Sequence, residues 1–190
     1  MDIYKDFPEE RRKTAAKLRG EDAAVLDEQA LLERCFAEIG HAEKLCGLFD
    51  QWKAEENELY DRDKKMREEA GMEPHGMLIL ASEVDVFNLW DGRAEKEEAD
   101  YESIRKEIGE GNLPYVLMML YAGADLAHGS WFLPKENDPG YKDSVCRLLQ
   151  TNQDDFVLYA DPHYMVKEKT PGVLGEWLRS GMEVVKKAAA

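Results

Sequence analysis

Two carboxylate–histidine pairs have the spacing that metal ligands adopt on a helix. Glu38 and His41 are three residues apart, and so are Asp125 and His128. On a helix this spacing places both side chains on one face, as in the Glu-x-x-His ligands of di-iron bundles. However, a glycine interrupts the first pair where a helix is expected to end, and the second pair lies beyond the end of another. We therefore expect turn-capping and surface roles for all four residues, with a metal site as the alternative.

The motifs of the common catalytic sites are missing from the sequence. It has no G-x-S-x-G nucleophile elbow, no P-loop and no G-x-G-x-x-G fingerprint. Its three cysteines, Cys35, Cys46 and Cys146, have no C-x-x-C spacing, and their odd number favours reduced thiols in the cytosol. Many carboxylates could supply an acid and a base, but no pattern places two of them together. We expect neither catalysis nor a cofactor.

An aromatic pair in a long polar loop is the sharpest indication of a binding site. Trp131 and Phe132 lie in a polar, glycine-flanked segment where no helical periodicity accounts for them. Exposed aromatic side chains beside carboxylates have the composition of protein-interaction hot spots. A shorter loop at 90–93, flanked by the acidic segment 95–102, is expected on the same edge, unless that segment is a solvated connector. Alternatively, the loop folds back and both rings fill a small core. The predicted contact residues are Trp90, Arg93, His128, Trp131, Phe132, Glu136 and Asp138.

The charge of the chain restricts its partners. Forty acidic residues against 25 basic ones give a formal net charge of −15 at pH 7. Such a surface repels phosphate backbones, so direct binding to nucleic acid is not expected. It attracts basic partners, both by steering and by complementary contacts. The alternative is that the acidity serves only solubility.

Short apolar helices separated by glycine account for much of the remaining chain. Leu45, Leu48, Phe49 and Trp52 follow an i, i+3, i+4, i+7 pattern, and Gly40 separates them from a similar helix at 30–39. Comparable breaks near Val84, at Gly111, at Thr151-Asn152 and at Gly181 predict about five helical hairpins, and glycine ends such helices readily in the left-handed conformation. Gly40 and Gly111 are 71 residues apart, and Gly111 and Gly181 are 70 apart, each about two periods of a helical repeat. Such hairpins cannot bury their apolar faces alone and must stack.

The stretch GNLPYVLMMLYAGAD at 111–125 resembles the second helix and following turn of an ankyrin repeat. In it, Asn112 is expected to cap the helix, Pro114 to fit its first turn, and Gly123 to end it before a turn at Asp125. ASEVDVFNLW and GHAEKLCGLFDQ are similar to degenerate copies, although no unit carries the full T-P-L-H opening. The resemblance implies an all-α, ankyrin-like helical-hairpin solenoid that binds proteins without catalysis. Plain solenoids of the TPR kind would explain the helix pairs but not the Gly-Ala-Asp punctuation.

A competing resemblance leads to a different function. The stretch LYADPHYMVKEKTPGVLGEWLRSGM at 158–182 is similar to the C-terminal part of TipA-type antibiotic-binding domains, which are all-helical. It covers about 25 residues, and its middle is shorter than in that family. The alternative function is therefore an all-helical protein that binds a small molecule, or a metal through its carboxylate–histidine pairs.

We expect one helical domain at 21–190, preceded by a cap or tail at 1–20. A charged helical insertion is expected at 53–73, and an extended loop at 126–141. The apolar runs are too short to span a bilayer and the N-terminus has no secretory signal, so we expect a cytoplasmic protein. The predicted function is an acidic, non-catalytic interaction scaffold. Its partner would have a basic surface, such as a nucleic-acid-handling enzyme that the protein inhibits in counter-defence or toxin neutralisation.

Overall fold

The protein is all-α in the part of the chain that its computed structural model describes, which is residues 27–71, 93–109, 111–159 and 171–190. Across these ranges no residue belongs to a β-strand. The helices are α2 (Glu28–Ala37), α3 (Ile39–Glu69), α5 (Arg93–Ile108), α6 (Leu113–Ala127), α7 (Tyr141–Tyr159) and α9 (Pro171–Ala189). The expected segments 1–20 and 78–90 lie outside the described residues. In the described ranges, no helix has both the length and the apolar character needed to cross a membrane.

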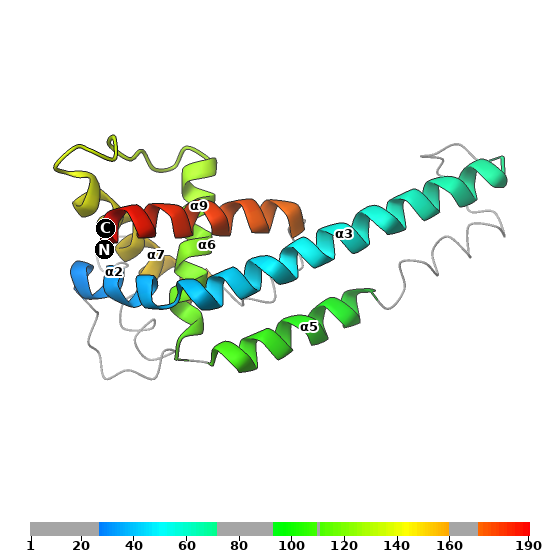
Figure 1. The fold of residues 1–190 in the computed structure, drawn as a ribbon, viewed down its shortest axis with the longest axis horizontal. Coiled ribbons are helices and arrows are strands. Elements are labelled where there is room, and N and C mark those ends of the chain that lie inside the picture. The colour runs from blue at the N-terminus through cyan, green and yellow to red at the C-terminus, as the bar shows by residue number, and fades with distance from the viewer. Residues whose placement is uncertain (1–26, 72–92, 110, 160–170) are drawn as a thin grey trace, which may run out of the picture.

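A bundle and a projecting arm make up the described molecule (Figure 1). In the bundle, α6 stands across α9 and the start of α3, and it also packs against α7 and α2. The arm consists of α3 beyond the bundle and of α5, which lies beside the part of α3 nearer to the bundle, from Lys44 next to Glu107 to Glu56 next to Arg93. The 31 residues of α3 correspond to about 46 Å of helix, so α3 extends well beyond the bundle.

The apolar helix at 113–127 is the centre of the bundle because its side chains are apolar on every side. Most of α6 is buried, including the consecutive stretch Tyr115–Leu120. A helix covered all round needs neighbours on every face, and α9, α7 and α2 supply them. This position explains the concentration of apolar residues at 113–127 without a repeat.

Two glycines allow α6 and α9 to cross with their backbones in contact. A Cβ atom added to Gly123 of α6 would lie 1.7 Å from the carbonyl oxygen of Trp177, and one added to Gly181 of α9 would lie 1.8 Å from that of Met119. The contact is reciprocal, since each glycine faces the backbone of a residue four positions before the other glycine. Both glycines are therefore required by close packing between helices rather than by a turn.

Several predicted helix breaks are wrong. Gly40 lies inside α3, Asn152 inside α7 and Gly181 inside α9. Neither Gly40 nor Gly181 has a positive φ. The first bend lies instead at Glu38, which separates α2 from α3 with φ −93° and ψ 7°. Glycine spacing misled the prediction because a glycine inside a helix can serve close packing or stay exposed, as Gly40 does. The segments around Asn152 and Gly181 are therefore single helices, whereas the two helices expected on either side of Gly40 are present as α2 and α3 and separate at Glu38, two residues earlier.

The ends of α6 agree in part with the sequence. Asn112 is at the N-cap with Pro114 in the first turn, as predicted, but the Asn112 side chain makes no capping bond. Its Nδ2 donates to the carbonyl oxygen of Ile108 at 3.0 Å instead. At the other end the prediction is wrong, because the helix continues past Gly123 to Ala127 and Gly129 takes the left-handed conformation at φ +69°. The resulting 6→1 and 5→2 backbone bonds form a Schellman motif.

The charged segment after residue 53 is helical as predicted, and it continues α3 to Glu69. Ion pairs at i, i+4 spacing form along it, among them one with 2.8 Å between Arg67 Nε and Asp63 Oδ1. The acidic segment 95–102 is part of α5, and its side chains other than Tyr101 are exposed or only partly buried. The apolar residues Tyr101 and Ile108 of α5 are buried.

Candidate functional site

Residues 129–140, here called the strap, connect α6 to α7 and are held at both ends. Gly129 and the Schellman motif fix its start on α6. Near its end, Asp138 forms a turn in which its Oδ2 accepts from the amide of Lys135 at 3.1 Å and its carbonyl oxygen accepts from Tyr141 at 3.0 Å. An ion pair from Glu136 to Lys187 joins the strap to the last turn of α9. The strap is therefore a braced surface segment.

The two aromatic residues of the strap lie on opposite sides of it. The Phe132 side chain is 85% exposed, whereas Trp131 is partly buried and packs against the core with Leu133. The prediction of an exposed pair is thus correct for Phe132 and wrong for Trp131. The sequence did not distinguish the two positions because adjacent residues in an extended segment point in opposite directions.

The indole N–H of Trp131 is buried without a hydrogen bond. Its Nε1 atom is inaccessible to solvent and has no hydrogen-bond partner. A buried donor without an acceptor costs roughly 1–3 kcal/mol. The closed position of Trp131 is therefore less stable than the packing of its ring alone would make it.

The carboxylates of the strap bond within the chain. Asp138 is engaged in its turn, and Glu136 pairs with Lys187, whose second partner is Glu183 at 2.7 Å. Hydrogen bonds that Lys187 donates to Glu136, and secondly to Glu183, raise the pKa of Lys187 above its usual range. The predicted contact residues Glu136 and Asp138 thus lie on the strap, but their carboxylates are engaged in contacts that hold the strap in place.

His128, the C-cap of α6, lies where the strap begins. Its Nδ1 donates to the carbonyl oxygen of Ala124 at 2.8 Å, and its ring meets the Trp177 ring edge-on with centroids 5.2 Å apart. The side chain therefore covers the end of its own helix and packs on α9. This capping role is the one expected from the sequence.

The two carboxylate–histidine pairs are used in separate local contacts. Glu38 is buried, and its Oε2 lies 2.6 Å from His41 Nδ1. Asp125 instead accepts a hydrogen bond from Asn152 of α7 at 3.1 Å. Within the described ranges, no three His, Cys, Asp or Glu side chains are grouped so that they could hold a metal ion. The alternative four-ligand set of Glu38, His41, Asp125 and His128 is therefore not assembled here.

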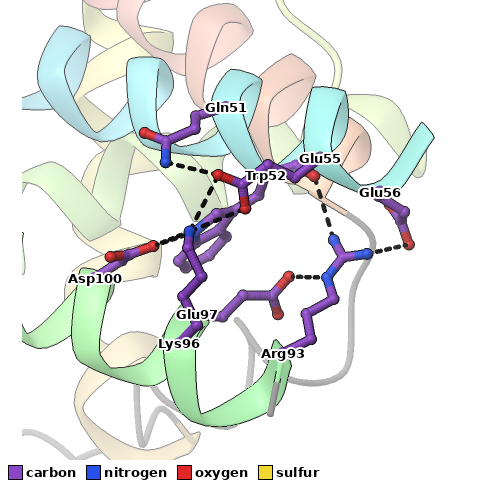
Figure 2. A network of polar contacts seen from close by, with 8 residues as sticks. All are labelled: Gln51, Trp52, Glu55, Glu56, Arg93, Lys96, Glu97 and Asp100. Carbon is purple, nitrogen blue, oxygen red and sulfur yellow. Dashed lines mark hydrogen bonds and ion pairs between the residues drawn. The ribbon is translucent and has the colours of Figure 1, made fainter. Parts of the chain in front are cut away.

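Arg93 lies in the arm, far from the strap. Figure 2 shows its guanidinium between the two helices, with Nε 2.7 Å from Glu97 Oε1 and Nη1 4.0 Å from Glu56 Oε1. Its Nη2 also donates to the carbonyl oxygen of Trp52 at 3.2 Å. The strap and α5 lie at opposite ends of the bundle in Figure 1, so the expectation that they share one edge is wrong. Trp90, the other residue of the predicted short loop, lies outside the described residues.

The polar network around Lys96 joins α5 to α3 (Figure 2). Lys96 Nζ lies 2.9 Å from Glu55 Oε2 and 2.8 Å from Asp100 Oδ2, and Trp52 Nε1 donates to Asp100 at 3.2 Å. The pKa of Asp100 is lowered chiefly by Lys96, that of Glu55 by Gln51 and Lys96, and that of Lys96 is raised chiefly by Asp100. Sequence reasoning missed this network, although the i, i+4 spacing of Lys96 and Asp100 was a signal for it. The network therefore consists of ion pairs and hydrogen bonds that hold α5 against α3.

Comparisons with protein-family models, with curated proteins and with solved structures find no match to this chain. The resemblances to ankyrin repeats and to TipA-type domains therefore stay predictions.

Proposed function

We propose that this protein is a non-catalytic interaction module that contacts a protein partner through the strap, with Phe132 as the anchor. The observation that carries this proposal is the 85% exposure of Phe132 on a segment braced at both ends. Fully burying a phenylalanine side chain contributes about 1.5–3 kcal/mol, which the free protein forgoes at this position. A partner with an apolar pocket recovers that contribution.

The bracing of the strap favours recognition over chance exposure. Asp138, Glu136 and Gly129 fix the backbone on either side of Phe132 before any partner arrives. The cost of ordering a segment on association is lower when the ends of that segment are already fixed. Phe132 is thus an exposed aromatic side chain between two fixed ends of the strap, and its residue type is enriched at protein interfaces.

The net charge of −15 supports a basic partner, by attraction at a distance. The strap carboxylates are engaged within the chain, so the charge acts through the surface as a whole and not through Glu136 and Asp138 beside Phe132. A nucleic-acid-handling enzyme, with a cationic channel, is the partner class we propose. Binding there would block access of its nucleic acid.

Site-specific photocrosslinking tests the proposal. A photoreactive phenylalanine replaces Phe132 in one variant, and it replaces two other exposed aromatic residues, Phe36 of α2 and Tyr60 of α3, in two matched controls. After expression in the native host, we expect a dominant adduct from position 132 that the two control positions do not give. Equal adducts from all three positions, or none from position 132, would contradict the proposal.

The crosslinked partner is then purified and titrated against unlabelled protein. We expect Phe132→Ala to weaken binding by about tenfold or more and Phe36→Ala to weaken it by less than about twofold. Raising the ionic strength from 0.05 to 0.5 M is expected to lower the association rate if the partner is basic. Association that does not respond to salt would refute the charge component while leaving the role of Phe132 intact.

A further inference from the structure

Trp131 and Trp52 provide an internal comparison between two buried indoles. Trp52 is 1% exposed, and its Nε1 donates to Asp100 at 3.2 Å. Trp131 is only partly buried, and its Nε1 has no acceptor. When an indole of the second kind moves into water, its N–H gains a hydrogen bond that it lacks in the folded position. Trp131 is therefore easier to withdraw than its packing alone implies.

The backbone of the strap permits this movement at one place. Among the described residues, 131–134 make no hydrogen bond to one another or to the helices. Gly129 precedes this stretch with a positive φ, and the turn at Asp138 with the Glu136–Lys187 ion pair follows it. The ends of the strap are bonded and its middle is held by side-chain packing, chiefly that of Trp131 and Leu133.

We propose that the strap opens between its two fixed ends by withdrawing Trp131 from the core, and that this open form contacts the partner. The opening itself is independent of any partner, whereas its use in binding rests on the proposed function. In the open form the indole joins Phe132 on the outer surface. The partner then covers both rings, and the apolar surface lost from the core is buried again in the complex.

Hydrogen exchange of the indole N–H groups tests the opening in the full chain without a partner. The Trp131 resonance is assigned with Trp131→Phe and the Trp52 resonance with Trp52→Phe. We expect the Trp131 N–H to exchange at least about tenfold faster than that of Trp52, since the latter must break a hydrogen bond and leave a full core site. Equal or slower exchange at Trp131 would overturn the proposal.

The same two variants give a second measurement. Trp131→Phe removes the unsatisfied donor and keeps a ring, so we expect a melting temperature equal to or above that of the natural sequence. Trp52→Phe leaves Asp100 without its indole donor, and we expect a lower melting temperature. If Trp131→Phe lowered the melting temperature as much as Trp52→Phe does, that result would also overturn the proposal.

Crosslinking at position 131 separates this inference from the proposed function. Adducts to the same partner from positions 131 and 132 support the open form as the binding form. An adduct from position 132 without one from position 131 supports the proposed function and overturns the use of the open strap. Fast exchange with no adduct at either position supports the opening and refutes the proposed function.

Discussion

Adding one methyl group at the crossing of α6 and α9 is expected to destabilise the fold severely. In Gly123→Ala the new Cβ would lie 1.7 Å from the carbonyl oxygen of Trp177, and in Gly181→Ala 1.8 Å from that of Met119. The obstructing atoms belong to the backbone in both cases, so no side-chain rotation removes the clash. The two helices must separate instead.

The expected cost follows from the displacement. To reach even 3.0 Å, the shortest separation that real Cβ atoms show, the helices must move apart by more than 1 Å at the crossing. Overpacking a core costs about 1–3 kcal/mol, and a clash between backbones belongs at the upper end. Alanine improves helix propensity by about 1 kcal/mol, which leaves a net loss of about 2 kcal/mol or more. For a chain of this length, the melting temperature is expected to fall by about 4–8 °C.

Thermal and urea unfolding of four variants tests this prediction. Gly47→Ala is the matched control, because Gly47 lies exposed in α3 with no atom within 4 Å of an added Cβ. At this position only the gain in helix propensity applies, and we expect the free energy of unfolding to increase by about 0.8–1 kcal/mol. The double variant at Gly123 and Gly181 should cost less than the two single losses added together, since either change already separates the helices. Unchanged or raised stability in Gly123→Ala or Gly181→Ala would refute the close crossing.

Three further outcomes are expected. First, because Glu55 and Asp100 have lowered pKa values, their pairing with Lys96 stabilises the arm at neutral pH and is lost as the pH falls below about 4. Urea unfolding should therefore show Lys96→Met to be less stable by about 0.5–1 kcal/mol at pH 7 and no less stable in acid; a deficit independent of pH would count against the pairing. Second, burial raises the pKa of the Cys35 thiol to about 12, so this thiol should react with Ellman's reagent only after denaturation. Rapid labelling of the native protein at Cys35, mapped by mass spectrometry, would show that α2 opens. Third, Phe132→Ser should change the free energy of unfolding by less than about 0.5 kcal/mol, because the ring is almost fully exposed. A larger loss by urea titration would mean that Phe132 belongs to the core.

The helical class and the core faces were predictable from local pattern. Leu45, Leu48, Phe49 and Trp52 are all buried on one side of α3, as their spacing predicts. The helical continuation past residue 53 was also predictable from its charge pattern. These features depend on residues within a few turns of one another, which is the range that periodicity reports.

The arrangement of the helices was not predictable in the same way. Gly123 and Gly181 were interpreted as helix ends because a local pattern cannot show a second helix that approaches from 58 residues away. The opposite placement of Trp131 and Phe132 depends on which side of the strap faces the core. Arg93 was grouped with them because the sequence does not show how far α5 lies from the strap. Each of these errors concerns long-range packing, and none concerns the helical propensity of a segment.

The crossing of α6 with α9 also constrains the order in which the protein can form during synthesis. The partner that covers Gly123 belongs to α9, which is translated after α6, so α6 leaves the ribosome before α9 exists to shield it. Until then its apolar surface is available to chaperones or to other nascent chains. The bundle is thus expected to close only after α9 has been translated, and removing α9 would leave the centre of the bundle uncovered.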